Sequence, residues 1–320
     1  MKRNFMKHCP VVSAHTVMAE WSNRSAADLQ LDIIQCKSTP KASRTARQTF
    51  VLENAANLMQ LKKSQDLNAT DLSVIKASDP SLLPLQDYAI PLSGMRCWHR
   101  DVLTGELKHF SVKQFVFCNE TMQMAHLDFA LVILGPPRVG KTPLAKSLLA
   151  AISMIHQEPG IGPFGLVVST VEAMPRSPDC RVRAGVPVLF DDMRPGVQRL
   201  TRPAHTLEDM KTLGEVRDGG QMAARYSDIH FEPNMSRVFT SNDSTPHAFF
   251  GSFPVGLEGM SNADVMRLDD HTLALVKRFA FLRLDTPVVP AAARAAFDTA
   301  RRGHALQAAA ALFSGEHAIP

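Results

Sequence analysis

Apolar residues between positions 131 and 284 gather in short runs, separated by polar and glycine-containing segments. Such bounded runs are typical of buried strands, whereas apolar residues at every third or fourth position are typical of helices. On this basis we expect strands at 131–134, 165–169, 186–192, 237–242 and 279–284, and helices at 144–152, 206–216 and 270–278. Strands that alternate with helices predict an α/β fold with a mostly parallel sheet.

The pattern before residue 121 is less regular and predicts mainly helices and loops. We expect helices at 17–36, 50–63 and 112–127, a basic linker at 37–48, loops at 64–95, and a hairpin over 98–110 that turns at Thr104-Gly105. After Pro290 an Ala-rich stretch to residue 313 favours a helix. We therefore divide the chain into a partly helical N-terminal region (1–120), an α/β core (121–286) and a C-terminal helix (287–320).

The segment after the first core strand carries the strongest chemical signal. It reads G-P-P-R-V-G-K-T and matches the P-loop pattern G-x-x-x-x-G-K-[ST] between a strand and a helix. Glycines let the backbone approach phosphate, and its N–H groups form an anion nest at the helix start. We expect Lys141 to reach the β- and γ-phosphates of ATP and Thr142 to bind Mg²⁺. The loop residues expected to hold the nucleotide are Gly135, Pro136, Pro137, Arg138, Val139, Gly140, Lys141, Thr142 and Pro143.

Two residues distinguish this loop from an average P-loop. Arg138 stands where many such loops carry a third glycine, so the turn must suit a side chain. Pro143 has no N–H and removes one phosphate donor, although proline suits the first turn of a helix. We expect nucleotide binding to persist with this donor missing.

Polar residues end two later strands. Asp191 and Asp192 follow an apolar run, and Asn242 follows another. We expect Asp191 to hold Mg²⁺, Asp192 to orient or deprotonate the attacking water, and Asn242 to sense the γ-phosphate. The alternatives are an exposed pair of acids at a strand end and an asparagine that only forms a turn.

A third group of candidates is basic. Arg278, next to Lys277, could act as an arginine finger toward the nucleotide of a neighbouring subunit, with Arg267 as a competitor. The alternative is that it only favours a helix C-terminus. The segment 211–231, around Gly219-Gly220, could form a hairpin that binds nucleic acid or one that is purely structural. Its candidate contacts are Lys211, Arg217, Arg225, Tyr226 and His230.

Composition changes this picture little. The chain is 45% hydrophobic and 21% charged, with no apolar run long enough for a membrane span. Its five cysteines are scattered and have no metal-ligand spacing, which favours reduced thiols in an intracellular protein, nuclear or cytoplasmic. The formal charge is +4, and residues 1–49 hold eight Lys/Arg against three acids, so they could bind phosphate or simply be a solvated terminus.

The order of these motifs resembles superfamily 3 helicases. The likeness is greatest to the helicase domain of rolling-circle replication proteins of single-stranded DNA viruses of the geminivirus and circovirus type, whose P-loop can carry arginine at the position of Arg138. The resemblance covers roughly 131–285. It implies an AAA+-like three-layer core with a five-stranded sheet, ATP and Mg²⁺ as cofactors, a homo-oligomer such as a hexameric ring, and movement on single-stranded DNA.

The nicking endonuclease of that family should bring a His-hydrophobic-His pair and a Tyr-x-x-Lys sequence. The chain has neither, so we expect no nicking activity. Two other functions stay open, namely a protein-remodelling ATPase of the AAA+ type and a nucleotide-binding scaffold with weak catalysis. A small-molecule kinase is disfavoured, because the order of the Asp-Asp and Asn strands fits an ATPase better.

Overall fold

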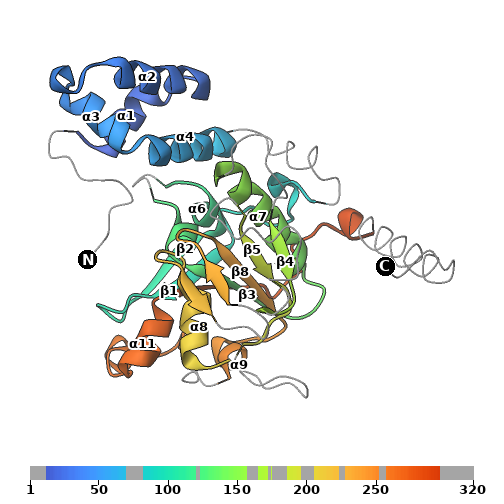
Figure 1. Cartoon of the computed structure of the whole chain (residues 1–320). Helices are drawn as coiled ribbons and strands as arrows, with labels where there is room; N and C mark the ends of the chain where they lie inside the picture. Colours follow the sequence, from blue (N-terminus) through green and yellow to red (C-terminus); the bar gives the residue numbers. More distant parts are fainter. Residues whose placement is uncertain are drawn as a thin grey trace, which may run out of the picture.

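The computed structural model describes residues 12–69, 82–119, 123–156, 165–171, 174, 186–195, 205–222, 228–251 and 257–295. Within them a seven-stranded sheet forms the centre of the molecule, in the order β2-β1-β9-β3-β8-β5-β4 (Figure 1). Its strands are β1 (Arg96–Arg100), β2 (Leu107–Ser111), β3 (Ala130–Leu134), β4 (Leu166–Val168), β5 (Val188–Phe190), β8 (Arg237–Ser241) and β9 (Phe279–Arg283). The five strands β9, β3, β8, β5 and β4 are parallel, which confirms the predicted α/β class and mostly parallel sheet.

The expectation of five strands was wrong, because the hairpin predicted over 98–110 extends the sheet. β1 and β2 pair in antiparallel fashion, and β1 adds to the edge of β9 through Cys97↔Leu282 and Trp98↔Phe281. The rings of Trp98 and Phe281 lie 4.7 Å apart between centroids. This contact joins residues far apart in sequence, so local periodicity could predict the hairpin but not its place in the sheet.

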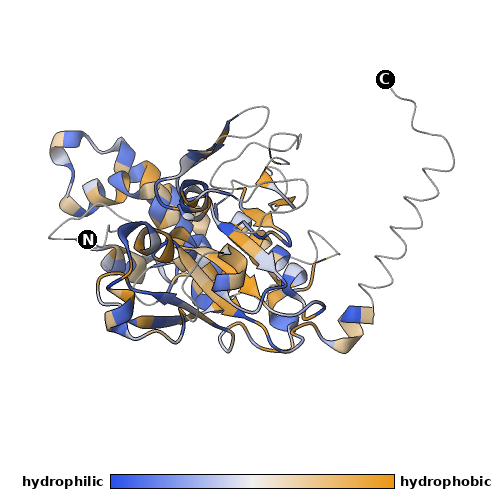
Figure 2. Cartoon of the chain, turned by 90° about the horizontal axis from the view of Figure 1, so that it is seen from below, coloured by the Kyte–Doolittle hydropathy of each residue, from blue (hydrophilic) through white to orange (hydrophobic). Residues whose placement is uncertain are grey.

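Helices cover both faces of the sheet, which gives three layers. Along β3, Leu131 and Ile133 join an apolar core with α7, while Val132 and Leu134 join a second core on the opposite face. Side chains of a strand alternate between faces, so a strand buried on both sides is apolar throughout. Figure 2 shows hydrophobic residues concentrated along these central strands.

The helices follow the predicted pattern with more breaks. They are α1 (Ala14–Trp21), α2 (Ala26–Ser38), α3 (Ala46–Glu53), α4 (Ala55–Ala69), α6 (Val112–Val116), α7 (Lys141–His156), α8 (Leu207–Gly214), α9 (Pro246–Phe250), α10 (Asn262–Val265) and α11 (Asp270–Val276), with 3-10 turns η1 (Lys41–Ser43), η2 (Leu85–Asp87) and η3 (Ala125–Leu127). The helix predicted over 206–216 is confirmed as α8, and Thr206 and Asp209 form a capping box at its start.

Several predicted boundaries were wrong. The single helix expected over 50–63 is interrupted at Asn54, between α3 and α4, and the one expected over 112–127 ends at Val116. The linker expected at 37–48 instead holds the end of α2, the turn η1 and the start of α3. Thr45 caps α3 with a capping box, a local signal strong enough to begin a helix within a basic stretch.

The N-terminal helices share one apolar core with the sheet. Trp21 and Leu58 belong to the same buried cluster as Leu148 of α7 and Leu282 of β9, and α4 contacts α7. In Figure 1 helices α1 to α4 lie to one side of the sheet, and α4 leads toward it. The sequence division at residue 120 therefore separates segments that share both a sheet and a core.

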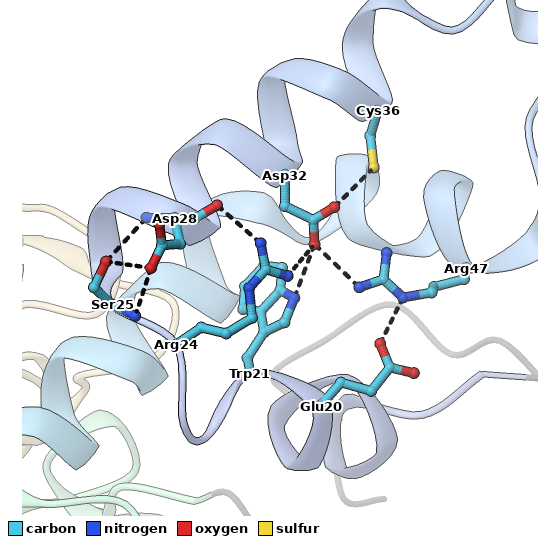
Figure 3. A network of polar contacts seen from close by, with 8 residues as sticks. All are labelled: Glu20, Trp21, Arg24, Ser25, Asp28, Asp32, Cys36 and Arg47. Carbon is cyan, nitrogen blue, oxygen red and sulfur yellow. Dashed lines mark hydrogen bonds and ion pairs between the residues drawn. The ribbon is translucent and has the colours of Figure 1, made fainter.

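A polar network centred on Asp32 connects helices α1, α2 and α3 (Figure 3). The Oδ2 atom of Asp32 accepts hydrogen bonds from Trp21 Nε1 and Arg47 Nη2, both at 3.0 Å, and from Arg24 Nη1 at 3.4 Å. Arg47 also donates to Glu20 at 2.6 Å. Two of the basic residues counted in the N-terminal region are therefore partly neutralised within the fold.

The chain continues past β9 into a helical turn over 291–295, after Pro290. The rest of the Ala-rich helix predicted up to residue 313 lies outside the described residues. Among the described helices, we find none with the length and apolar character that a bilayer crossing requires.

Candidate functional site

The P-loop connects the end of β3 to the start of α7, as its pattern predicts. Gly135 and Gly140 have φ angles of 143° and 99°, a region that favours glycine. A Cβ on Gly135 would lie 2.1 Å from the carbonyl oxygen of Leu284, so only glycine fits there. Arg138 has a φ of 70°, and the position where many P-loops carry glycine therefore does adopt a left-handed conformation.

Lys141 is held over the loop by three acceptors. Its Nζ atom donates to the carbonyl oxygens of Gly135 at 2.7 Å and Pro136 at 2.8 Å, and to Oδ1 of Asn242 at 2.9 Å. An ammonium group has three donors, and all three are used. Burial lowers the pKa of Lys141 below its ordinary value. The nearby carboxylates of Asp192 and Asp191 offset only part of this effect.

Asp191 faces the P-loop threonine. Its Oδ1 atom accepts hydrogen bonds from the hydroxyls of Thr142 at 2.7 Å and Thr240 at 2.6 Å. Neither bond uses Oδ2. The predicted pair of metal ligands, Thr142 and Asp191, is therefore in direct contact.

Asn242 links Lys141 to the second carboxylate. Its amide oxygen accepts from Lys141, and its Nδ2 donates to Oδ1 of Asp192 at 3.0 Å. Strand order explains this position, because β8 lies between β3 and β5 and its carboxyl end falls between the P-loop and the two aspartates. The structure thus brings together Lys141, Thr142, Asp191, Asp192 and Asn242 from the ends of three adjacent parallel strands.

The oxygen atoms of Thr142 and Asp191 are a donor set that suits Mg²⁺. Magnesium is commonly held by one or two protein oxygens and completed by phosphate and water oxygens. Thr142 and Asp191 could supply two such oxygens side by side. No cluster of three or more His, Cys, Asp or Glu side chains suited to a metal occurs among the residues that the structure describes, but a site of this kind does not need one.

Pro143 lies in the first turn of α7, where proline is compatible with a helix. The helix is intact around it, since Leu144 N donates to the carbonyl oxygen of Gly140 at 3.1 Å. The missing phosphate donor therefore causes no fold defect, and its effect on nucleotide binding stays a prediction.

Three site residues were missed by sequence reasoning. Thr240 contacts both aspartates, Asp243 accepts a backbone hydrogen bond from Gly135 N at 3.0 Å, and Arg194 pairs with Asp243 at 3.1 Å. The signal that could have identified Thr240 is a hydroxyl next to the apolar pair Val238-Phe239 in a strand that is buried throughout, because a buried hydroxyl needs partners.

Arg278 lies at the opposite edge of the sheet from the P-loop of its own chain. Its backbone carbonyl accepts from Ala130 N, at the amino end of β3. Its side chain is 19% exposed, and its Nε lies 2.8 Å from Oε2 of Glu215, with an angle too poor for a hydrogen bond. A finger role would require this pair to open, whereas Arg267 is 80% exposed and pairs only loosely with Asp264, at 3.6 Å.

The segment predicted to bind nucleic acid is a hairpin, but its glycines are not at the tip. β6 (Gly220–Met222) pairs with β7 (Ile229–Phe231), and Gly219 precedes the first strand with a φ of 69°. A Cβ on Gly219 would lie 2.3 Å from the carbonyl oxygen of Phe231, so the glycine serves close packing at the hairpin base. Arg225 and Tyr226 fall between these strands and lie outside the described residues.

The other three predicted nucleic-acid contacts differ in whether their side chains are already paired within the fold. Lys211 pairs with Glu208 at 2.6 Å, and Arg217 pairs with Asp128 at 2.7 Å. His230 is exposed on β7. Two of the three would therefore exchange an existing ion pair for a phosphate contact.

The chain has been compared with models of known protein families and with curated proteins, and neither comparison gives a match.

Proposed function

We propose that the chain is a Mg²⁺-dependent ATPase that acts on single-stranded nucleic acid as a homo-oligomer. The observation that carries the ATPase part is the meeting of Lys141, Thr142, Asp191, Asp192 and Asn242 at one edge of the sheet. These residues follow the carboxyl ends of three separate strands, β3, β5 and β8. A chance match of one loop pattern would not explain why the other strand ends place the complementary groups beside it.

The side chains support distinct steps of phosphoryl transfer. When ATP binds, Lys141 would donate to phosphate oxygens, which carry more charge, in place of the loop carbonyl oxygens of Gly135 and Pro136. Thr142 and Asp191 would hold the metal ion, which would supply positive charge to offset the charge of the phosphates. Asp192 accepts a proton from the attacking water or orients it, and the Nδ2 group of Asn242 lies beside this carboxylate to fix its direction.

The nucleic-acid and oligomer parts rest on the resemblance and on the hairpin β6–β7. The hairpin places His230 on an exposed strand face, and Arg267 offers an accessible guanidinium for contact with a second copy. No observation of comparable weight favours a protein substrate.

The decisive experiment measures ATP hydrolysis by the purified full chain with and without single-stranded DNA or RNA. We expect Mg²⁺-dependent hydrolysis that nucleic acid stimulates, and its loss in Lys141→Ala. Lys146→Ala is the matched control, because Lys146 lies on the same helix but is exposed. Unchanged hydrolysis in Lys141→Ala would disprove the site, and hydrolysis indifferent to nucleic acid would disprove the helicase-like function while leaving an ATPase.

A further inference from the structure

Thr240 carries a buried hydroxyl near the carboxyl end of β8. It is 1% exposed and lies in β8, two residues before Asn242. It contacts three consecutive residues that follow β5. Its hydroxyl bonds with Asp191 and Asp192, and its backbone carbonyl accepts from Met193 N at 3.2 Å.

The two bonds of the hydroxyl run in opposite senses. It donates to Oδ1 of Asp191 at 2.6 Å and accepts from the backbone N–H of Asp192 at 2.9 Å. A hydroxyl has one proton to give, and here that proton is directed to Asp191. Together with Thr142 it fixes the rotation of the Asp191 carboxylate, so that Oδ2 is the oxygen free of both bonds.

The backbone of Asp192 gives the second observation. Its φ is 53°, in the left-handed region that non-glycine residues seldom adopt and that surrounding contacts must stabilise. The bond from its N–H to Thr240 supplies such a contact. This conformation directs the Asp192 side chain toward Asn242, while the side chain of Asp191 points toward Thr142. Two adjacent acids thereby face different partners.

We propose that Thr240 is a positioning residue that divides the work of the two aspartates, holding Asp191 for the metal ion and Asp192 for the water. The inference rests on the proposed ATPase function. It goes beyond it by assigning the separation of the two carboxylate roles to a hydroxyl on the neighbouring strand. Groups that orient metal ligands in this way are commonly worth 10- to 100-fold in metal affinity or activity.

The test compares Thr240→Val, which keeps the shape but removes the hydroxyl, with Thr240→Ser, which keeps the hydroxyl. The first measurement is binding of a fluorescent ADP with and without Mg²⁺, and the second is ATP hydrolysis over a range of Mg²⁺ concentrations. In Thr240→Val we expect binding without Mg²⁺ to stay within about 3-fold of wild type. We expect the Mg²⁺ concentration for half-maximal effect to rise, and kcat to fall, each by about 10- to 100-fold. Thr240→Ser should recover most of both losses.

The outcomes separate the two proposals. If the wild type binds and hydrolyses ATP but Thr240→Val has an unchanged Mg²⁺ dependence, the positioning role is wrong and the ATPase stands. If Thr240→Val weakens binding equally with and without Mg²⁺, or if serine gives no recovery, the residue is structural and the inference is overturned. If the wild type shows no Mg²⁺-dependent nucleotide binding, both proposals fail.

Discussion

Asp32 and Asp191 are two aspartates that each accept several hydrogen bonds, in different regions and from different donors. Asp32 lies among the N-terminal helices, and its partners include two guanidinium groups, an indole N–H and, at 3.9 Å from its other oxygen, the thiol of Cys36 (Figure 3). Asp191 lies at the carboxyl edge of the sheet and accepts from two neutral hydroxyls, both on one oxygen.

The difference shows how a structural carboxylate can be told from one suited to a ligand. The guanidinium groups of Arg24 and Arg47 neutralise Asp32 through Oδ2, the Cys36 thiol lies at Oδ1, and the Asp32 side chain is only 13% exposed. A metal ion would have to displace arginines there. The Asp191 carboxylate is oriented without being neutralised by a guanidinium, and one oxygen is left outside its hydroxyl bonds. Asp32 accepts more hydrogen bonds than Asp191, so the number of hydrogen bonds alone would have pointed to Asp32 as the ligand site.

The largest expected effect in this comparison is on activity at Asp191. Asp191→Asn keeps an acceptor for the two hydroxyls but removes the charge, and we expect ATP hydrolysis to fall by about 10²–10³-fold, as when one transition-state contact is lost. The free energy of unfolding should change by less than about 1 kcal/mol, because both hydroxyls keep a partner. Asp270→Asn, at an exposed acid in the first turn of α11, is the control. Wild-type hydrolysis in Asp191→Asn would remove the distinction between the aspartates.

Asp32 should show the reverse pattern. Asp32→Asn leaves Arg24 and Arg47 without their shared anion, and we expect it to destabilise the N-terminal helices by about 2–3 kcal/mol. Hydrolysis per folded molecule should be unchanged. The chain has two tryptophans, so urea unfolding followed by fluorescence in a Trp98→Phe background reports on Trp21 alone.

Glu20→Gln is the matched control for this variant. Glu20 contacts only Arg47 in the network and is 45% exposed, so its loss should cost less than about 1 kcal/mol. Equal effects of the two substitutions would show that Asp32 is an ordinary surface partner.

The smallest expected effect is a pH dependence of the Asp32 contribution. Burial raises the pKa of Asp32, but hydrogen bonds and charge from Arg47, with Trp21 and Arg24, hold it below its ordinary value of 3.8. A depressed pKa in the folded state stabilises the fold above the unfolded pKa, and this stability is lost as pH falls through the folded value. The stability difference between wild type and Asp32→Asn should therefore be constant from pH 7 to about 5 and shrink below about 4.

The stability of wild type must be compared with that of Asp32→Asn at each pH, because two histidines also make the stability of the fold depend on pH. Burial lowers the pKa of His126 to about 3 and of His156 to about 4, and their Nε2 atoms lie 2.8 Å apart. Both are neutral in the fold and would take up protons on unfolding, so they lower stability as pH falls below about 6.5. This loss is common to wild type and Asp32→Asn and cancels in their difference. A difference that already shrinks near pH 6 would contradict the assignment to Asp32.

Much of the core could be predicted from sequence because its signals are local. Apolar runs predicted the strands, the spacing of apolar residues predicted the helix over 206–216, and the glycine pattern predicted the P-loop. The P-loop glycines were predicted from the motif, as residues that let the backbone approach phosphate, whereas the close approach of Gly135 to the backbone of Leu284 was seen only in the structure. The polar ends of β5 and β8 could be read as site residues only because the carboxyl ends of parallel strands meet at one edge.

Tertiary structure decided what depends on distant partners. The hairpin 98–110 became part of the sheet through Trp98 and Phe281, and Arg217 was neutralised by Asp128, 89 residues away. Thr240 gained its importance from two aspartates 48 and 49 residues earlier. The sequence by itself determined the residues to which we assign phosphate chemistry in our proposal, because short-range patterns encode backbone shape. The structure alone determined which charges are neutralised and that hydroxyls, not arginines, orient the Asp191 carboxylate, because those properties depend on contacts between strands and helices far apart in the chain.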